Sequence, residues 1–359
     1  MNQGNNYTYT PLKEPIPITE QEWPEGTLPL VTTQTITYMH ESFIRECIEG
    51  ILMQKTTFPV EIVIHDDAST DKTADIVREY QAKHPRLIKA IYQKENQLSK
   101  AGRGTMREDI NKLVRGKYIA LCEGDDYWTD PLKLQKQVEF LEENEEYSIC
   151  AHETQIHYIE TDKQPILFKD FPSNPFKSRE KKIFTIEDTF QGIICHTSSL
   201  LIRRSSIMHY LQHQNLFNDI VSGDNILISA AAANGPIYWM DDIMSIYRIN
   251  RNGITKTSEK FIVKNIWLEN KILMYATLNK FFNYNYSATL NMRINYYQKQ
   301  LIAYYYESWR KKKNYSSLKK LLTKNPPNKL ITFLFNKKKH RIFQIMKKLI
   351  LKISAIILY

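Results

Sequence analysis

Short apolar runs alternate with amphipathic segments through the first third of this 359-residue chain. The apolar runs are typical of buried strands, and the segments between them carry apolar residues at helical spacing. Strands are expected at residues 30–37, 60–64, 87–92 and 117–122, and helices at 41–54, 72–83 and 103–115. Strands that alternate with helices of about ten to fifteen residues predict βαβ units and a parallel sheet.

Acidic clusters follow two of the expected strands. Asp66 and Asp67 come after the second strand, and Glu123, Asp125 and Asp126 come after the fourth. Ligands of parallel sheets bind beyond the carboxyl ends of the strands, so both clusters fall where a ligand is expected. Like charges this close repel unless a cation lies among them, and Mg²⁺ or Mn²⁺ takes oxygen ligands and can bridge carboxylates to a diphosphate. Each cluster by itself could instead be a polar turn that caps a helix.

Two segments carry a resemblance to a known family. VEIVIHDDASTDKT (60–73) and GKYIALCEGDDYWTDPLKLQKQ (116–137) resemble family 2 glycosyltransferases of the GT-A fold. The resemblance covers residues 29–255 and implies an α/β fold whose mostly parallel central sheet is flanked by helices. It also implies an inverting enzyme that moves a sugar from a nucleotide-diphosphate donor, expected to be a UDP-sugar, to an acceptor hydroxyl. Many members build bacterial surface polysaccharides.

The resemblance assigns roles to the two acidic clusters. Asp67 matches the aspartate that contacts the base or ribose, and Asp66 is its neighbour. Asp125 matches the second acid of the family's Asp-x-Asp motif and would bind Mn²⁺ or Mg²⁺. Glu123 stands where the motif has its first aspartate, and a longer carboxylate there could reach the ribose or a metal-bound water.

The same resemblance points to a catalytic base. Asp224, in the segment Ser222-Gly-Asp-Asn, matches the catalytic aspartate of the acceptor side. Displacement at the anomeric carbon needs a base on the face opposite the leaving diphosphate. A helix N-cap is the alternative role for Asp224, and Asp219, Asp241 and Asp242 are rival bases.

Four further residues would contact the nucleotide by resemblance. Thr37 and Tyr38 begin what is Thr-Tyr-Asn in the family, with Met39 in place of the asparagine. Arg107 stands where many members carry an arginine that faces the nucleotide, and Arg248 belongs to a Tyr-Arg element that could hold the diphosphate. Either arginine could instead be a solvated surface charge.

Two other functions remain open from the residues alone. A sugar-1-phosphate nucleotidyltransferase also combines a parallel sheet with metal-binding carboxylates. It would need a glycine-rich phosphate loop after the first strand, and residues 35–41 contain no glycine. A membrane-recruited, non-catalytic binding module on the same fold is the second possibility, because Glu123 and Met39 depart from the family pattern.

The positive charge gathers at the C-terminal end. The net charge is +10, yet residues 310–359 hold fifteen Lys or Arg and no acid, which leaves 34 basic and 39 acidic residues in the rest. A mildly acidic body is not expected to bind nucleic acid. Residues 341–359 can be drawn as a helix with a wide apolar face, which favours attachment to an anionic membrane surface. Docking of this helix on protein is the alternative.

These patterns predict three parts, which are a polar leader (1–28), a GT-A catalytic domain (29–255, divided into a nucleotide-binding half 29–126 and an acceptor half 127–255) and a helical basic extension (256–359). No segment has the apolar core of a signal peptide or the ~20 apolar residues of a membrane span. Four scattered cysteines fit buried thiols better than disulfides. We therefore expect a cytoplasmic enzyme at the inner face of the plasma membrane, with a glycan or lipid-linked acceptor.

Overall fold

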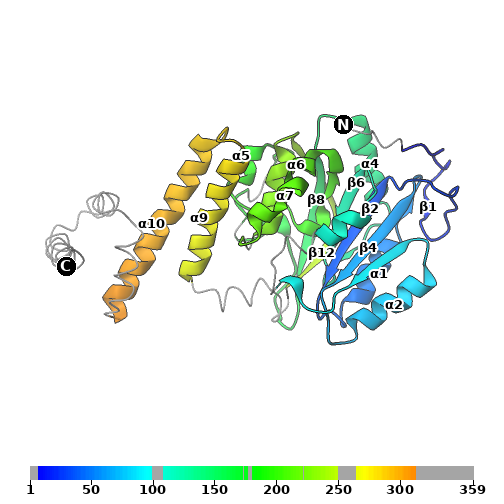
Figure 1. Cartoon of the computed structure of the whole chain (residues 1–359), viewed down its shortest axis with the longest axis horizontal. Coiled ribbons are helices and arrows are strands. Elements are labelled where there is room, and N and C mark those ends of the chain that lie inside the picture. The colour runs from blue at the N-terminus through cyan, green and yellow to red at the C-terminus, as the bar shows by residue number, and fades with distance from the viewer. Residues whose placement is uncertain are drawn as a thin grey trace.

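The computed structural model describes residues 7–98, 108–172, 174–176, 180–220, 222–249 and 264–312, with side chains up to Tyr305. One large sheet runs through the molecule, and helices cover both of its faces (Figure 1). Its strands are β2 (Val31–Thr37), β4 (Val60–Asp66), β5 (Ile88–Tyr92), β6 (Tyr118–Leu121), β7 (Tyr127–Trp128), β8 (Ile149–Tyr158), β9 (Ile166–Leu167), β10 (Ile183–Phe184), β11 (Leu201–Arg203) and β12 (Ile237–Ile249). The spatial order is β10-β12-β8-β11-β6-β2-β4-β5, with β7 paired to β12 and β9 to β8.

The first half of the sheet is parallel, as the alternating pattern predicts. β2 pairs in parallel with β4 and β6, and β4 pairs in parallel with β5. Thr37 lies opposite Asp66 in this register, so the carboxyl ends of the strands share one edge. Beyond β6 the sheet is mixed, because β11 runs antiparallel between β6 and β8 while β8 and β12 are parallel. The expected α/β fold with a helix-flanked sheet is confirmed.

Two apolar cores lie on the two faces of the sheet. The first lies beneath α1 (Ile44–Leu52), α2 (Thr73–Lys83) and α4 (Lys133–Glu143). The second lies beneath the helical segment 108–113, α5 (Ile186–Thr189), α6 (Met208–Gln212) and α7 (Gly223–Ala232). Side chains of β6 alternate between the two cores, with Tyr118 and Ala120 in the first and Ile119 in the second.

Short elements complete the fold. A two-stranded ribbon joins β1 (Ile16–Pro17) to β3 (Lys55–Thr56), so part of the predicted leader is fixed against the rest of the protein. Among the described residues there are four 3₁₀ turns, η1 (Phe168–Asp170), η2 (Thr197–Ser199), η3 (Arg204–Ile207) and η4 (Gln214–Phe217).

The C-terminal helices form an antiparallel pair. α9 (Lys264–Phe281) and α10 (Ser287–Lys312) lie side by side at the end of the molecule (Figure 1). Their apolar side chains, including Leu268, Met274 and Leu301, join the same core as α7. Across the described part of the chain, we find no helix whose length and apolar character would let it cross a membrane. The predicted surface helix at 341–359 lies outside the described residues.

Candidate active site

A tight loop after β6 carries the fourth-strand acids. The backbone N–H of Gly124 donates to the carbonyl of Ile36 at 3.0 Å, which holds this loop against the end of β2. A Cβ atom at position 124 would lie 2.6 Å from Oγ1 of Thr37 and 2.8 Å from Nδ1 of His40. Glycine is therefore required between the two acids, because any side chain there would push the loop away from β2.

Glu123, Asp125 and Asp126 form one carboxylate group. One oxygen from each lies within 4.8 Å of the others. Asp126 is completely buried, and its Oδ1 accepts a 3.0 Å hydrogen bond from the backbone N–H of Arg248. Its Oδ2 accepts no hydrogen bond from the described residues. Burial, together with the charges of Asp125 and Glu123, holds the pKa of Asp126 well above its usual range.

This carboxylate group fits a hard divalent cation. An ionised carboxylate that is buried without a partner is costly, and a cation removes that cost by supplying positive charge. Mg²⁺ and Mn²⁺ prefer carboxylate oxygens, and three are gathered here. The sequence assigns only Asp125 to the metal, whereas the structure makes Asp126 the most buried acid of the group.

Arg248, near the end of β12, braces the acidic loop. Its guanidinium donates to the carbonyl oxygen of Asp125 at 3.0 Å and forms an ion pair with Glu46 of α1. The same group lies 4.2 Å from the ring centre of Tyr127 and 5.3 Å from that of Phe43. Burial lowers the pKa of Arg248 to about 10, so the guanidinium stays charged at neutral pH. Arg248 is therefore a fixed positive charge beside the acids, not the solvated surface arginine that was the alternative.

A histidine, His40, lies between Thr37 at the end of β2 and the carboxylate of Asp125. The buried Thr37 hydroxyl lies 3.2 Å from Nδ1 of His40, and Nε2 of His40 lies 3.8 Å from Oδ2 of Asp125. Tyr38 is exposed beside them. His40 is not among the residues predicted from the sequence, although its place just after a sheet-edge Thr-Tyr pair is a usable signal.

The acids at the end of β4 hold local backbone. Oδ1 and Oδ2 of Asp67 accept hydrogen bonds from the backbone N–H groups of Gln97 and Leu98, at 2.7 and 3.1 Å. Asp66 accepts one from the backbone N–H of Ser69 at 3.1 Å, while its other carboxylate oxygen accepts none from the described residues. Both side chains are buried at the sheet edge where the nucleotide was expected. Each oxygen of Asp67 keeps a second lone pair, so a base or ribose contact could add to these backbone hydrogen bonds.

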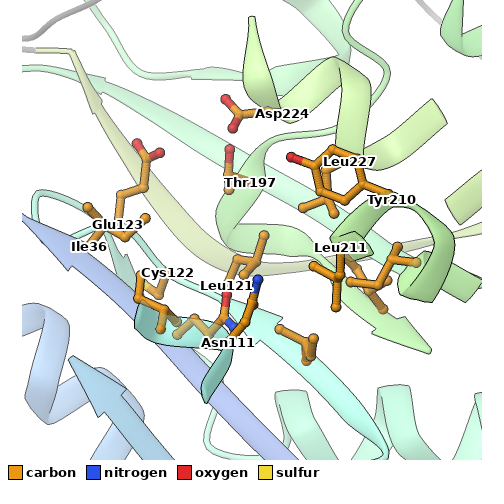
Figure 2. Close-up of a pocket in the computed structure, with 15 residues that line it drawn as sticks. Ile36, Asn111, Leu121, Cys122, Glu123, Thr197, Tyr210, Leu211, Asp224 and Leu227 are labelled. Atoms are coloured by element: carbon orange, nitrogen blue, oxygen red, sulfur yellow. The ribbon is translucent and has the colours of Figure 1, made fainter. Parts of the chain in front are cut away.

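Asp224 and Glu123 line the same pocket, a cavity of about 50 Å³ between the sheet and α7. Asp224 is in the first turn of α7, where the helix dipole favours a carboxylate. Figure 2 shows the two carboxylates at the same end of the pocket, with Thr197 directly below Asp224 and apolar residues such as Leu121 and Leu211 further in. The pocket is therefore lined both by one member of the carboxylate group that could bind a metal and by a separate carboxylate that could act as a base.

A buried histidine, His196, lies near the carboxylate group. Its ring stacks on Tyr247 with centroids 4.0 Å apart, and its Nδ1 accepts from the backbone N–H of Ser198. Nε2 therefore carries the proton of the neutral ring and lies 3.8 Å from Oδ2 of Asp126. Burial lowers the pKa of His196 to about 4 although the charge of Asp224 opposes the shift, so His196 is neutral at pH 7.

The rival bases lie elsewhere. Asp219 is exposed, and Asp241 and Asp242 form ion pairs with Lys182 and Lys136 on the surface. None of the three lines the pocket that contains Asp224. Arg107, the remaining predicted nucleotide contact, lies outside the described residues.

Comparisons with known proteins agree with this arrangement. Residues 34–211 match the model of the family described as Glycosyl transferase family 2. An uncharacterized protein of Mycobacterium tuberculosis is 34% identical over 220 residues, which are 61% of this chain and 59% of that protein. A putative teichuronic acid biosynthesis glycosyltransferase of Bacillus subtilis is 27% identical over 243 residues, 67% of this chain and 86% of the relative.

A solved structure shares the fold. A mannosyltransferase from Pyrobaculum calidifontis, solved in complex with GDP-Man and Mn²⁺, gives a TM-score of 0.50 at 15% identity and covers 92% of this chain and 88% of its own. The chain spans about 59% of the length of the mycobacterial relative. The family match and the sheet-edge acids together confirm the resemblance seen in the sequence. This chain belongs to glycosyl transferase family 2.

Proposed function

We propose that this protein is an inverting, metal-dependent glycosyltransferase that moves a sugar from a nucleotide-diphosphate donor to an acceptor hydroxyl. One observation carries the proposal: the pocket is lined by Glu123, from the carboxylate group after β6, and by Asp224, from the start of α7. The donor diphosphate belongs at the first carboxylate and the acceptor hydroxyl at the second. Family membership supports the reaction class.

In the proposed reaction, Asp224 takes the proton of the acceptor hydroxyl. The acceptor oxygen forms its bond to the anomeric carbon as the bond from that carbon to the diphosphate oxygen breaks, which inverts the configuration. A divalent metal held by Asp125 and Asp126 would offset the charge that builds on the leaving diphosphate. Arg248 supplies fixed positive charge at the same edge and braces the carbonyl of Asp125.

The donor contacts remain those implied by the resemblance. They are Thr37, Tyr38, Asp66, Asp67, Arg107, Glu123 and Arg248. A UDP-sugar is the proposed donor, although the mannosyltransferase that shares the fold was solved with GDP-Man. The acceptor is proposed to be a glycan or a lipid-linked glycan of surface polysaccharide assembly at the inner face of the plasma membrane. The name of the Bacillus subtilis relative supports such a pathway.

The test is a transfer and hydrolysis assay of the full chain against a panel of UDP- and GDP-sugars, with Mn²⁺ and with EDTA. We expect one donor to be consumed with Mn²⁺ and none with EDTA. Asp125→Asn should lower turnover by orders of magnitude without loss of folding, while Asp75→Asn, a control on the exposed face of α2, should not. Turnover that survives EDTA would overturn the metal-dependent mechanism. Donor consumption by Asp125→Asn at the wild-type rate would do the same.

A further inference from the structure

A lysine from the C-terminal helices is buried at the start of α7, the helix that carries the proposed base. Lys271 of α9 is 9% exposed, and its Nζ donates a 2.9 Å hydrogen bond to Oγ of Ser222, the residue at the start of α7. Lys271 therefore crosses from the helical pair at the end of the chain to the helix turn that presents Asp224.

Two flanking contacts fix the position of α9. The side-chain amide of Asn270 donates to the carbonyl of Asp219 at 2.8 Å, just before α7. One helical turn after Lys271, the Tyr275 hydroxyl donates to the carbonyl of Phe190 at 2.9 Å. Leu268 and Tyr275 are also buried in the core that α7 shares. The approach of Lys271 to Ser222 is thus held by the packing of the whole helix.

Ser222 is used in an unusual way for its position. A serine at the start of a helix commonly accepts a hydrogen bond from a backbone N–H of the first turn. The side chain of Ser222 makes no such capping bond, and its oxygen accepts from Lys271 instead. The first turn of α7 is therefore tied to α9 rather than capped by its own serine.

An ammonium at this position is costly to bury. Burial lowers the pKa of Lys271 to about 8, the charge of Arg293 on α10 acts in the same direction, and Asp224 opposes both. Replacing a buried charge by an apolar side chain of similar size is often neutral or stabilising. Methionine would fill the same space without this cost, so the hydrogen bond to Ser222 is the contact that only the amine can supply.

We propose that Lys271 is a positioning residue for the proposed base: its ammonium holds the first turn of α7 through Ser222 and places positive charge beside Asp224, so that the carboxylate faces the acceptor hydroxyl in the pocket. This inference rests on the proposed function of Asp224. It also makes the α9–α10 pair a working part of the catalytic unit, whereas residues 256–359 were expected to be a separate extension.

The test compares Lys271→Met and Lys271→Arg with Lys280→Met, a control at the exposed end of α9. Turnover, the Kd of the nucleotide sugar with Mn²⁺ and Tm are measured for each full-length variant. We expect Lys271→Met to lower kcat by about 10- to 100-fold, since small misplacements of catalytic groups have effects of this size. Its donor Kd should be unchanged and its Tm unchanged or higher. Lys271→Arg should recover part of kcat, and Lys280→Met should match wild type.

A double-mutant cycle separates this inference from the proposed function. Asp224→Asn alone should lower kcat, and adding Lys271→Met to it should lower kcat no further, because the lysine acts through the base. Wild-type kcat in Lys271→Met, or losses that multiply in the double variant, would overturn the role of Lys271 and leave Asp224 as the base. A fall in Tm that accompanies the loss of kcat and that arginine does not reverse would also overturn it. Wild-type kcat in Asp224→Asn would overturn the base assignment and this inference together.

Discussion

Asp126, in the loop after β6, is hydrogen-bonded to Arg248, near the end of β12. The backbone N–H of Arg248 donates to Oδ1 of Asp126 at 3.0 Å, and the guanidinium of Arg248 donates to the carbonyl of the preceding residue, Asp125. Arg248, near the end of the predicted acceptor half, thus holds the two acids that close the predicted nucleotide-binding half. The two halves of the sheet are joined at the point where donor and acceptor would meet.

Asp126→Asn tests whether the buried carboxylate is kept for a cation. The amide keeps the shape and can still accept the hydrogen bond from the backbone N–H of Arg248. It removes an ionisable carboxyl group whose pKa is raised by burial. We expect Tm without metal to be equal to or above wild type, and the rise in Tm that Mn²⁺ causes in wild type to be reduced or absent. Asp75→Asn on α2 should retain that rise in full. An equal Mn²⁺-dependent rise in Asp126→Asn would show that this acid does not help to hold a metal.

Gly124→Ala tests the close approach of the acidic loop to β2. The added methyl group would lie 2.6 Å from the Thr37 hydroxyl oxygen, so the loop must move. We expect the free energy of unfolding to fall by about 1–3 kcal/mol, as for other overpacked sites, and turnover to fall at least about tenfold. Gly192→Ala, whose Cβ would meet Pro175 at 3.2 Å, should have a smaller effect on both. Chemical denaturation and the transfer assay measure the two quantities, and unchanged turnover in Gly124→Ala would contradict the expectation.

Lys133→Met should change how stability depends on pH. Lys133 is completely buried 4.0 Å from the ring centre of Trp128, and burial lowers its pKa from 10.5 to about 7. Between these two values the unfolded chain binds more protons than the folded one, so this residue makes the free energy of unfolding rise with pH. Methionine removes that dependence.

The gain in free energy of unfolding from Lys133→Met should therefore be largest at and below pH 7 and shrink toward pH 10. Urea unfolding at several pH values measures it, and Lys280→Met should show no such trend. A gain in the free energy of unfolding that stays constant or grows with pH would mean that burial does not lower the pKa of Lys133 in the folded protein.

The basic C-terminal segment should bind anionic membranes. Lys and Arg near such a surface each contribute about 1 kcal/mol, and residues 310–359 carry fifteen of them without an acid. We expect the full chain to sediment with anionic vesicles at low salt and a version that ends at Asn336 to sediment less. Neutral vesicles are the control for charge. If both versions stay in the supernatant with anionic vesicles at low salt, the segment is not a membrane anchor.

Sequence patterns could predict the sheet edge because it depends on short-range order. The acids after β4 and β6 follow apolar strands, and the carboxyl ends of parallel strands share one edge, so Asp67 and Asp125 could be predicted to lie at this edge of the sheet. The role of Asp67 in holding Gln97 and Leu98 was not predictable, because it depends on the path of a loop about thirty residues away.

Two contacts that depend on long-range packing could not be predicted from the sequence. In the sequence, Lys271 looks like an ordinary charge on an amphipathic helix. Its contact with Ser222 becomes visible only in the folded structure, where α9 lies next to the start of α7. Glu46 pairs with Arg248 only because α1 packs against β7, the strand that pairs with β12. Neither pairing leaves a local pattern, since the partners lie far apart in the chain and meet through the fold of the whole sheet.

The anomeric configuration of the first product tests the central claim most directly. It can be measured by proton NMR during transfer from the donor that the panel identifies, before any spontaneous mutarotation of a hydrolysis product. A single displacement with Asp224 as base gives a product whose configuration is inverted relative to the donor. A product that retains the donor configuration would contradict the account.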